Sequence, residues 1–263
     1  MSASRQALFQ AVLDRPDEDE PRIRFADFLD AQGDPYGAFI RAQLELTHTL
    51  RCGSDEVASQ LREKARELRY DHRTPEWTNG VEKLGADPEF IRGFVDRIVI
   101  DARTYVDHAD ELYRRAPIRQ LVLTGVGDIA ETIARDSRLS RITWLTIDGK
   151  PTVGDRGLGA ITGSPHVRTL RVLSASCQEI TIGGLEALCA SKQLPALVYA
   201  NLVGNFFEDP IEGYGTDWVT SRIVPESIRL SAFGKQLEQK YGELPWLHGP
   251  SRLRHFPPYA DEF

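Results

Sequence analysis

In the first 70 residues, apolar positions recur at intervals of three and four, which is the spacing of helices that bury one face. The pattern predicts four helices, running from Ser4 to Leu13, from Pro21 towards Gly33, from Pro35 to about Leu50 and from about Asp55 to Tyr70. Gly33 is expected in the left-handed conformation that ends a helix, and Asp34 is expected to cap the helix that follows. The carboxylates between positions 27 and 34 are therefore expected on a solvated surface beside Arg41, not in an active site.

Further along the chain, five segments share the pattern apolar-x-x-apolar-x-apolar, which we call the strand motif. They begin at Val95, Ile118, Ile142, Val167 and Leu197, so that successive starts are 23 to 30 residues apart. Leucine-rich repeats recur every roughly 20 to 29 residues, and each supplies a strand and a helix. Segments with helical spacing lie between the motifs, at 105–116, 129–136, 156–162 and 182–190. The sequence thus predicts an α/β leucine-rich repeat solenoid of about five strand-helix repeats.

The ends of such an array predict the domain organisation. A terminal repeat needs a cap to cover its apolar face. The N-terminal helices are expected to form one cap, and a helical stretch containing Leu237 and Tyr241 is expected to form the other. The predicted divisions are a helical domain at 1–75, the repeats at 76–224, and a C-terminal cap helix with a tail at 225–263. The tail, HGPSRLRHFPPYADEF, is rich in proline and aromatic residues and is expected to dock on its own protein.

Residues 5 to 50 add a resemblance to a known family. The segments Phe25–Leu29, Gly33–Pro35, Gly37 and Phe39–Arg41 resemble a helical repeat-companion domain that occurs beside leucine-rich repeats in bacterial proteins, with a pattern of the type YADWLEERGDPRGEFIRLQ. Phe28 stands where the family has tryptophan, and Tyr36 stands where it has arginine. The resemblance implies that repeats follow. It implies no catalytic activity.

Composition limits the partners that are expected. The chain of 263 residues has a formal net charge of −7 and a sequence pI near 5.5. Nucleic acids and anionic membranes require a concentrated basic surface, so neither is expected as a partner. Cys52, Cys177 and Cys189 are an odd number without metal-ligand spacing, which favours reduced thiols. The N-terminus MSASRQALFQ lacks a secretion signal, and no apolar run approaches the roughly 18 residues of a membrane span, so a cytoplasmic location is expected.

Patterns typical of catalysis or metal binding are sparse. The six histidines are scattered and form no HExxH pattern. The chain contains neither a G-x-S-x-G nucleophile motif nor a phosphate-binding loop with its lysine. We therefore expect no enzymatic activity, no metal and no cofactor.

One segment supports an alternative function. Gly125, Gly127 and Ala130 form a GxGxxA pattern between a predicted strand and a predicted helix, and Asp148 closes the next strand. In NAD(P)-binding enzymes of the Rossmann class, such glycines let the pyrophosphate approach a helix N-terminus while an acidic residue binds the ribose. Polar residues alternate with apolar ones in these strands, however, whereas a Rossmann sheet is buried on both faces. The Rossmann-like enzyme is therefore the weaker hypothesis.

The expected function depends on which strand residues face solvent. Successive side chains of a strand point to opposite faces, so the residues between the apolar motif positions are expected to line an open, concave surface. Arginine, tyrosine and tryptophan commonly anchor protein interfaces. We therefore expect a non-enzymatic protein- or peptide-binding adaptor or scaffold. Its predicted contact residues are Arg97, Asp101, Gln120, Trp144, Asp148, Arg171, Tyr199 and Asn201.

Two alternatives stay open at this point. In the first, a loop or the C-terminal tail covers Trp144 and Tyr199, and the predicted surface is not open. The chain is alternatively a structural subunit of a larger assembly. The sequence leaves the oligomeric state and the identity of the partner undetermined.

Overall fold

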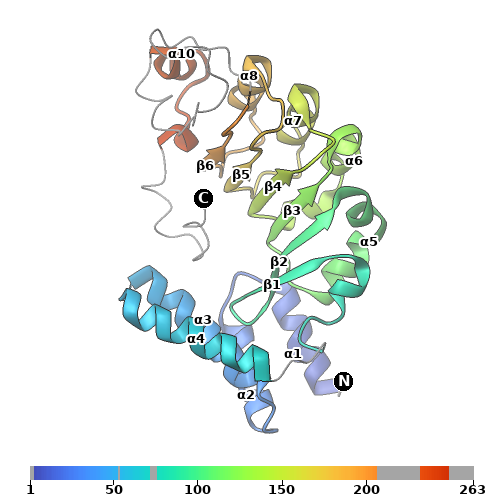
Figure 1. The fold of residues 1–263 in the computed structure, drawn as a ribbon, viewed down its shortest axis with the longest axis vertical. Coiled ribbons are helices and arrows are strands. Elements are labelled where there is room, and N and C mark those ends of the chain that lie inside the picture. The colour runs from blue at the N-terminus through green and yellow to red at the C-terminus, as the bar shows by residue number, and fades with distance from the viewer. Residues whose placement is uncertain (1–2, 53, 72–75, 206–231, 249–263) are drawn as a thin grey trace. The chain divides into compact units, whose positions relative to one another are not determined.

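The computed structural model describes residues 3–52, 54–71, 76–205 and 232–248 (Figure 1). The described residues divide into two compact units. The first, which we call the N-terminal unit, comprises Met1–Ile98 and His108–Arg119. The second, the sheet unit, comprises Val99–Asp107 and the described part of Gln120–Arg254. The tail beyond His248, for which a docked conformation is predicted, lies outside the described residues.

The N-terminal unit begins with the four predicted helices. They are α1 (Ala3–Asp14), α2 (Glu20–Asp30), α3 (Tyr36–Cys52) and α4 (Asp55–Asp71), and consecutive helices pack together. Gly33 has a φ of +68°, as a left-handed helix end requires. The Asp34 carboxylate accepts a hydrogen bond from the Tyr36 backbone N–H at 3.0 Å, which confirms its predicted capping role. Arg41 pairs with both Asp27 and Asp30, so these carboxylates belong to a surface ion-pair cluster.

A short strand hairpin packs against these helices. It consists of β1 (Asp87–Ile91) and β2 (Phe94–Asp101), preceded by the 3-10 helix η1 (Val81–Leu84). The two-residue connection makes the strands antiparallel, and Arg92 and Gly93 both adopt the positive φ that such turns favour. A Cβ atom on Gly93 would lie 2.6 Å from the Ile40 Cα atom, so only glycine permits this close approach of the hairpin to α3.

Tyr36 lies at the centre of the aromatic core of the N-terminal unit. Its ring stacks on Trp77 with centroids 4.7 Å apart, and its hydroxyl donates to the Gly93 carbonyl at 2.8 Å. Phe25 and Phe94 contact the same ring from α2 and β2. Burial raises the pKa of Tyr36, which keeps the phenol protonated as a donor. The family-like segment is therefore a scaffold in which helix and hairpin share one core.

A buried ionic cluster joins α2 to the hairpin. Arg22 and Asp96 are almost completely buried, and the Arg22 Nη2 atom lies 3.6 Å from Asp96 Oδ2. Arg22 also donates to the Pro16 and Arg92 carbonyls, at 2.8 and 3.2 Å. Burial, followed by repulsion from Arg92, lowers the Arg22 pKa to about 10. Burial raises the pKa of Asp96 against the opposing effects of Arg22, Arg92 and Arg119.

The six strands of the two units form one open sheet in the order β1-β2-β3-β4-β5-β6. The hairpin is followed along the chain by β3 (Gln120–Thr124), β4 (Trp144–Asp148), β5 (Val172–Ser174) and β6 (Tyr199–Asn201). These four pair in parallel. Because strand order follows chain order and such crossovers are right-handed, the connecting helices lie on one face. Figure 1 shows α6 (Ala130–Ala134), α7 (Gly154–Thr162) and α8 (Ile182–Ala190) along that face of the sheet unit.

The other described elements are helices. The helix α5 (Ala102–Arg115) follows β2, and the 3-10 helices η2 (Gly127–Ile129) and η3 (Ser137–Arg141) flank α6. After β6, the structure describes α10 (Ala232–Tyr241) and η4 (Pro245–His248). Every apolar position of the five strand motifs is buried. The predicted core of the strands is therefore confirmed.

The predicted leucine-rich repeat solenoid is wrong. The strands form a single six-stranded, mostly parallel mixed sheet that is neither closed nor curled. A solenoid requires equivalent units, but α5 has 14 residues, α6 has 5 and α7 and α8 have 9 each, while the hairpin contains no connecting helix. The strand motif indicates only that a strand follows a tight turn. Many α/β sheets contain such strands. The N-terminal helices pack on the hairpin of their own unit, and their predicted role as an end cap stays a prediction.

We predict that Arg22 contributes far more stability than its neighbour Arg24 on the same helix. Arg22→Met leaves Arg92, 3.7 Å away, as the remaining cation beside the buried Asp96, so we expect the free energy of unfolding to fall by about 3 kcal/mol. Arg24→Met removes only an exposed pair with Glu20, and we expect a loss of about 0–1 kcal/mol. Urea denaturation of both variants measures the difference. Equal losses would show that the buried pair has no special role.

Candidate functional site

The strand register shows which predicted contact residues share a face of the sheet unit. Gln120, Trp144, Val172 and Tyr199 are aligned across β3 to β6. Val122, Thr146, Ser174 and Asn201 form the next aligned row, two residues further along each strand. Side chains two apart in a strand point to the same face, so both rows share one face. The opposite face carries Leu121, Leu145, Leu173 and Ala200.

Much of this polar face is buried. Trp144 is only 5% exposed, and its indole N–H donates to the Thr146 hydroxyl at 3.2 Å. Gln120 is 2% exposed, and its Oε1 atom makes no hydrogen bond. Asn201 is also buried, and its side-chain oxygen accepts from the Val203 N–H at 3.2 Å. Tyr199 is half-buried, which raises its pKa. These side chains are packed within the protein. They expose little surface to a partner, which speaks against their predicted role as exposed anchors.

The acidic residues of the prediction cap local structure. Asp101 is exposed and accepts hydrogen bonds from the backbone N–H groups of Thr104 and Arg103 at the start of α5. The bond from Thr104 is the main reason that the pKa of Asp101 is lowered. Asp148 is exposed as well, and its carboxylate accepts from the Gly149 N–H at 2.7 Å. Both carboxylates therefore have structural partners.

The two predicted arginines do not join the aligned rows. Arg97 belongs to the N-terminal unit, where it pairs with Glu89 across the hairpin at 2.6 Å. Arg171 precedes β5. The strand motif predicts that Leu170 aligns with Leu145, but in the structure Leu173 aligns with Leu145. The motif is thus displaced by three residues in β5. An odd displacement exchanges the faces of the strand, so Val172 takes the place beside Trp144 that the motif gives to Thr169.

The glycines of the Rossmann-like pattern form hydrogen bonds with a neighbouring loop. The Gly125 N–H donates to the Asp148 carbonyl at 3.0 Å, and the Gly127 N–H donates to the Pro151 carbonyl at 3.1 Å. A Cβ atom on Gly127 would lie 2.5 Å from the Pro151 ring. The amides that would bind a pyrophosphate are thus already engaged. The sequential strand order also lacks the reversal at which dinucleotides bind in a Rossmann sheet.

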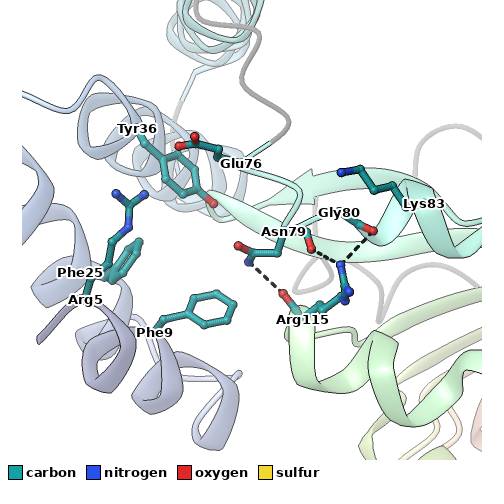
Figure 2. A pocket seen from close by; sticks show the side chains of 9 residues that line it. All are labelled: Arg5, Phe9, Phe25, Tyr36, Glu76, Asn79, Gly80, Lys83 and Arg115. Carbon is teal, nitrogen blue, oxygen red and sulfur yellow. Dashed lines mark hydrogen bonds between the residues drawn. The ribbon is translucent and has the colours of Figure 1, made fainter. Parts of the chain in front are cut away.

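The N-terminal unit contains a pocket that the sequence did not indicate. Its volume is about 480 Å³, and Figure 2 shows Arg5, Phe9 and Phe25 on one side of it and Asn79, Gly80 and Arg115 on the other. Tyr36, Glu76 and Lys83 complete the lining. Phe9, Phe25 and Tyr36 give the pocket an aromatic wall, whereas Arg5, Lys83 and Arg115 give it basic groups. We call this the aromatic-basic pocket.

Hydrogen bonds hold the walls of the aromatic-basic pocket in place. Arg115 donates to the Asn79 and Gly80 carbonyls at 2.8 and 3.3 Å, and the Asn79 side chain returns a hydrogen bond to the Arg115 carbonyl at 2.9 Å. Arg5 pairs with Asp34 at 3.2 Å, and its guanidinium lies 5.9 Å from the Phe25 ring centroid. The pocket is therefore a preformed part of the scaffold.

Charges at the mouth of the pocket have fewer partners. Within the described part of the chain, neither Lys83 nor Glu76 forms an ion pair, and both are exposed. Arg5 and Arg115 are paired with Asp34 and Glu111, which do not line the pocket. With these two partners counted, three carboxylates accompany the three basic side chains, so Lys83 is the basic group of the lining without an ion pair among the described residues.

Periodicity could not have located this pocket, because its residues come from α1, α2, α3, α5 and the segment before β1. The one local signal is Asn79-Gly80, a dipeptide typical of turns, and both residues have positive φ. Among the residues described, no group of three or more His, Cys, Asp or Glu side chains is arranged to hold a metal. No helix in the described ranges is long and apolar enough to cross a membrane.

We predict that Trp144 acts through stability. Trp144→Ala removes a large buried side chain, so we expect the free energy of unfolding to fall by about 3–5 kcal/mol. Tyr199→Ala, at the aligned position on β6, should cost less because Tyr199 is only half-buried. Urea denaturation followed by circular dichroism gives both values. A loss below about 1 kcal/mol for Trp144→Ala would contradict this role.

Comparison with known proteins identifies no relative of this chain. No protein-family model, no curated protein and no solved structure matches it. The resemblance of residues 5 to 50 to the repeat-companion domain therefore stays a prediction. The function has to be argued from the pocket, the charges and the strand face described above.

Proposed function

We propose that the chain is a non-enzymatic binding protein for a polypeptide partner. In this proposal the aromatic-basic pocket takes an aromatic side chain of the partner together with a neighbouring carboxylate. The observation that carries it is the combination, in one pocket of about 480 Å³, of an aromatic wall and an exposed lysine, Lys83, that has no ion pair among the described residues.

The size and lining of the pocket support this ligand class. Ligand pockets commonly enclose about 300–1,000 Å³ and combine apolar walls with a few placed polar groups. The buried rings of Phe9 and Phe25 line the pocket, and an aromatic group beside such rings prefers offset or edge-on packing. An aromatic residue inserted into a pocket is also the usual anchor of a protein interface. The pocket therefore suits one anchoring residue of a partner.

The charges of the pocket favour an acidic group beside that aromatic ring. Lys83 is exposed at the pocket and can turn its ammonium towards a carboxylate without losing an existing ion pair. Asp34 and Glu111 already pair with Arg5 and Arg115, so Lys83 is the group expected to meet the carboxylate. Glu76 opposes the potential of Lys83, so its charge tunes the preference for anions.

We predict that N-acetyl-phenylalanine binds the intact protein and that N-acetyl-phenylalaninamide binds more weakly. The two probes share the ring, but only the first carries a carboxylate. For molecules of this size we expect a Kd on the order of 1 mM for the acid. Saturation-transfer NMR titrations measure both. Equal binding of acid and amide would remove the basic groups from the proposal.

Matched variants place the binding in the pocket. Lys83→Glu should weaken binding of N-acetyl-phenylalanine about three- to tenfold, because it replaces an attractive charge by a repulsive one. Glu76→Gln should strengthen this binding, because it removes a repulsive charge. Lys64→Glu on α4 changes the net charge equally but lies outside the pocket lining, so it should have little effect. If Lys64→Glu weakened binding as much as Lys83→Glu, the effect would come from net charge and the pocket would not be the site.

A further inference from the structure

Glu76 and Lys83 precede and follow one tight turn of the N-terminal unit. The turn contains Asn79 and Gly80, which both have positive φ, and the Lys83 N–H donates to the Gly80 carbonyl at 3.2 Å. Both charged residues line the aromatic-basic pocket (Figure 2). One short segment therefore brings an acidic and a basic side chain to the same pocket.

Contacts within the N-terminal unit hold this segment in place. Trp77, the residue after Glu76, is buried and stacks on Tyr36 with ring centroids 4.7 Å apart. Arg115 donates to the Asn79 carbonyl at 2.8 Å. Because the backbone is already ordered, a ligand that meets the two charges does not have to order it, which lowers the entropic cost of binding.

The charges of Glu76 and Lys83 are not used within the described part of the chain. Both side chains are exposed, and neither forms an ion pair with the other or with any described residue. The two arginines of the lining, in contrast, already have carboxylate partners. The pocket therefore offers a ligand one carboxylate and one ammonium group as well as its aromatic wall.

A ligand that matches these groups carries a cation, an anion and an aromatic ring within a few bonds of one another. A free aromatic α-amino acid is such a molecule, because at neutral pH the carbon that bears its side chain carries an ammonium and a carboxylate. A residue inside a polypeptide lacks both charges, since its amino and carboxyl groups form peptide bonds. The volume of about 480 Å³ is in the range of small-molecule sites.

We propose that the aromatic-basic pocket binds a free aromatic α-amino acid, with Glu76 facing its ammonium and Lys83 facing its carboxylate. The ring of the ligand lies against the wall that Phe9, Phe25 and Tyr36 form. This inference rests on the proposed function, because it concerns the same pocket, and it adds a form of regulation. The amino acid and the aromatic anchor of the polypeptide partner exclude each other, so the free amino acid displaces the partner.

Three ligands with the same ring separate the contributions of the two charges. L-phenylalanine carries both charges, N-acetyl-L-phenylalanine carries only the carboxylate, and L-phenylalaninamide carries only the ammonium. Saturation-transfer NMR titrations of the intact protein measure all three. We expect L-phenylalanine to bind about three- to tenfold more tightly than either derivative, because only it meets both charges. L-alanine, which has both charges and no ring, should bind at least about tenfold more weakly than L-phenylalanine.

The variant Glu76→Gln should have opposite effects on two of these ligands. It removes the partner of the ammonium, so we expect L-phenylalanine to bind about three- to tenfold more weakly than to the unchanged protein. It also removes a charge that repels a carboxylate, so N-acetyl-L-phenylalanine should bind more tightly. Glu67→Gln, at an exposed position of α4 outside the lining, changes the net charge equally and should leave both affinities unchanged.

Competition tests the regulatory part of the proposal. An excess of L-phenylalanine should abolish saturation transfer to N-acetyl-L-phenylalanine, because the two ligands share one site. Persistence of that signal would mean that they bind separately, and the displacement of a partner would then be wrong.

Two further results would overturn the amino-acid site itself. One is L-phenylalanine binding no more tightly than N-acetyl-L-phenylalanine, and the other is an equal effect of Glu76→Gln and Glu67→Gln on L-phenylalanine. Either result is compatible with tighter binding of N-acetyl-phenylalanine than of its amide, in which case the proposed function stands and only the present inference fails. No binding of any of the ligands at millimolar concentration would overturn both.

Discussion

The buried pairing of Asp96 with Arg22 is the constraint on which the N-terminal unit depends. A charge removed from water is stable only when other charges and hydrogen bonds replace its hydration. Arg22 meets part of this condition by donating to the Pro16 and Arg92 carbonyls while it faces Asp96, whose Oδ2 atom makes no hydrogen bond, so the loop before α2 and the turn of the hairpin must meet at that point. The aromatic core around Tyr36 then closes over the same hairpin. The aromatic-basic pocket is a consequence, since Phe25 and Tyr36 form its wall from within this core.

The sheet unit follows from a different constraint, the sequential order of parallel strands. With no reversal of strand order, helices occupy one face and leave a polar row of Thr146, Ser174 and Asn201 on the other. The same order gathers the helix-to-strand turns at one edge.

Local patterns predicted the elements well and the candidate site poorly. Gly33 and Asp34 form the predicted joint because their backbone preferences act within a few residues. The strands appeared where the strand motif placed them, but the three-residue displacement in β5 depends on how Leu173 pairs with Leu145. Arg171 was therefore assigned to the wrong row. The pocket was missed because Arg5, Phe25 and Arg115 approach one another only in the folded chain.

The sequence by itself determined the helices, the buried strand positions and the capping residues, since each follows from side-chain periodicity or from the conformational preference of one residue. Only the tertiary structure decided that the sheet is open and begins with a hairpin instead of forming a solenoid. It also decided that Trp144 is buried. The physical reason is that curvature, register and charge clustering depend on packing between segments far apart in the chain, and periodicity carries no record of that packing.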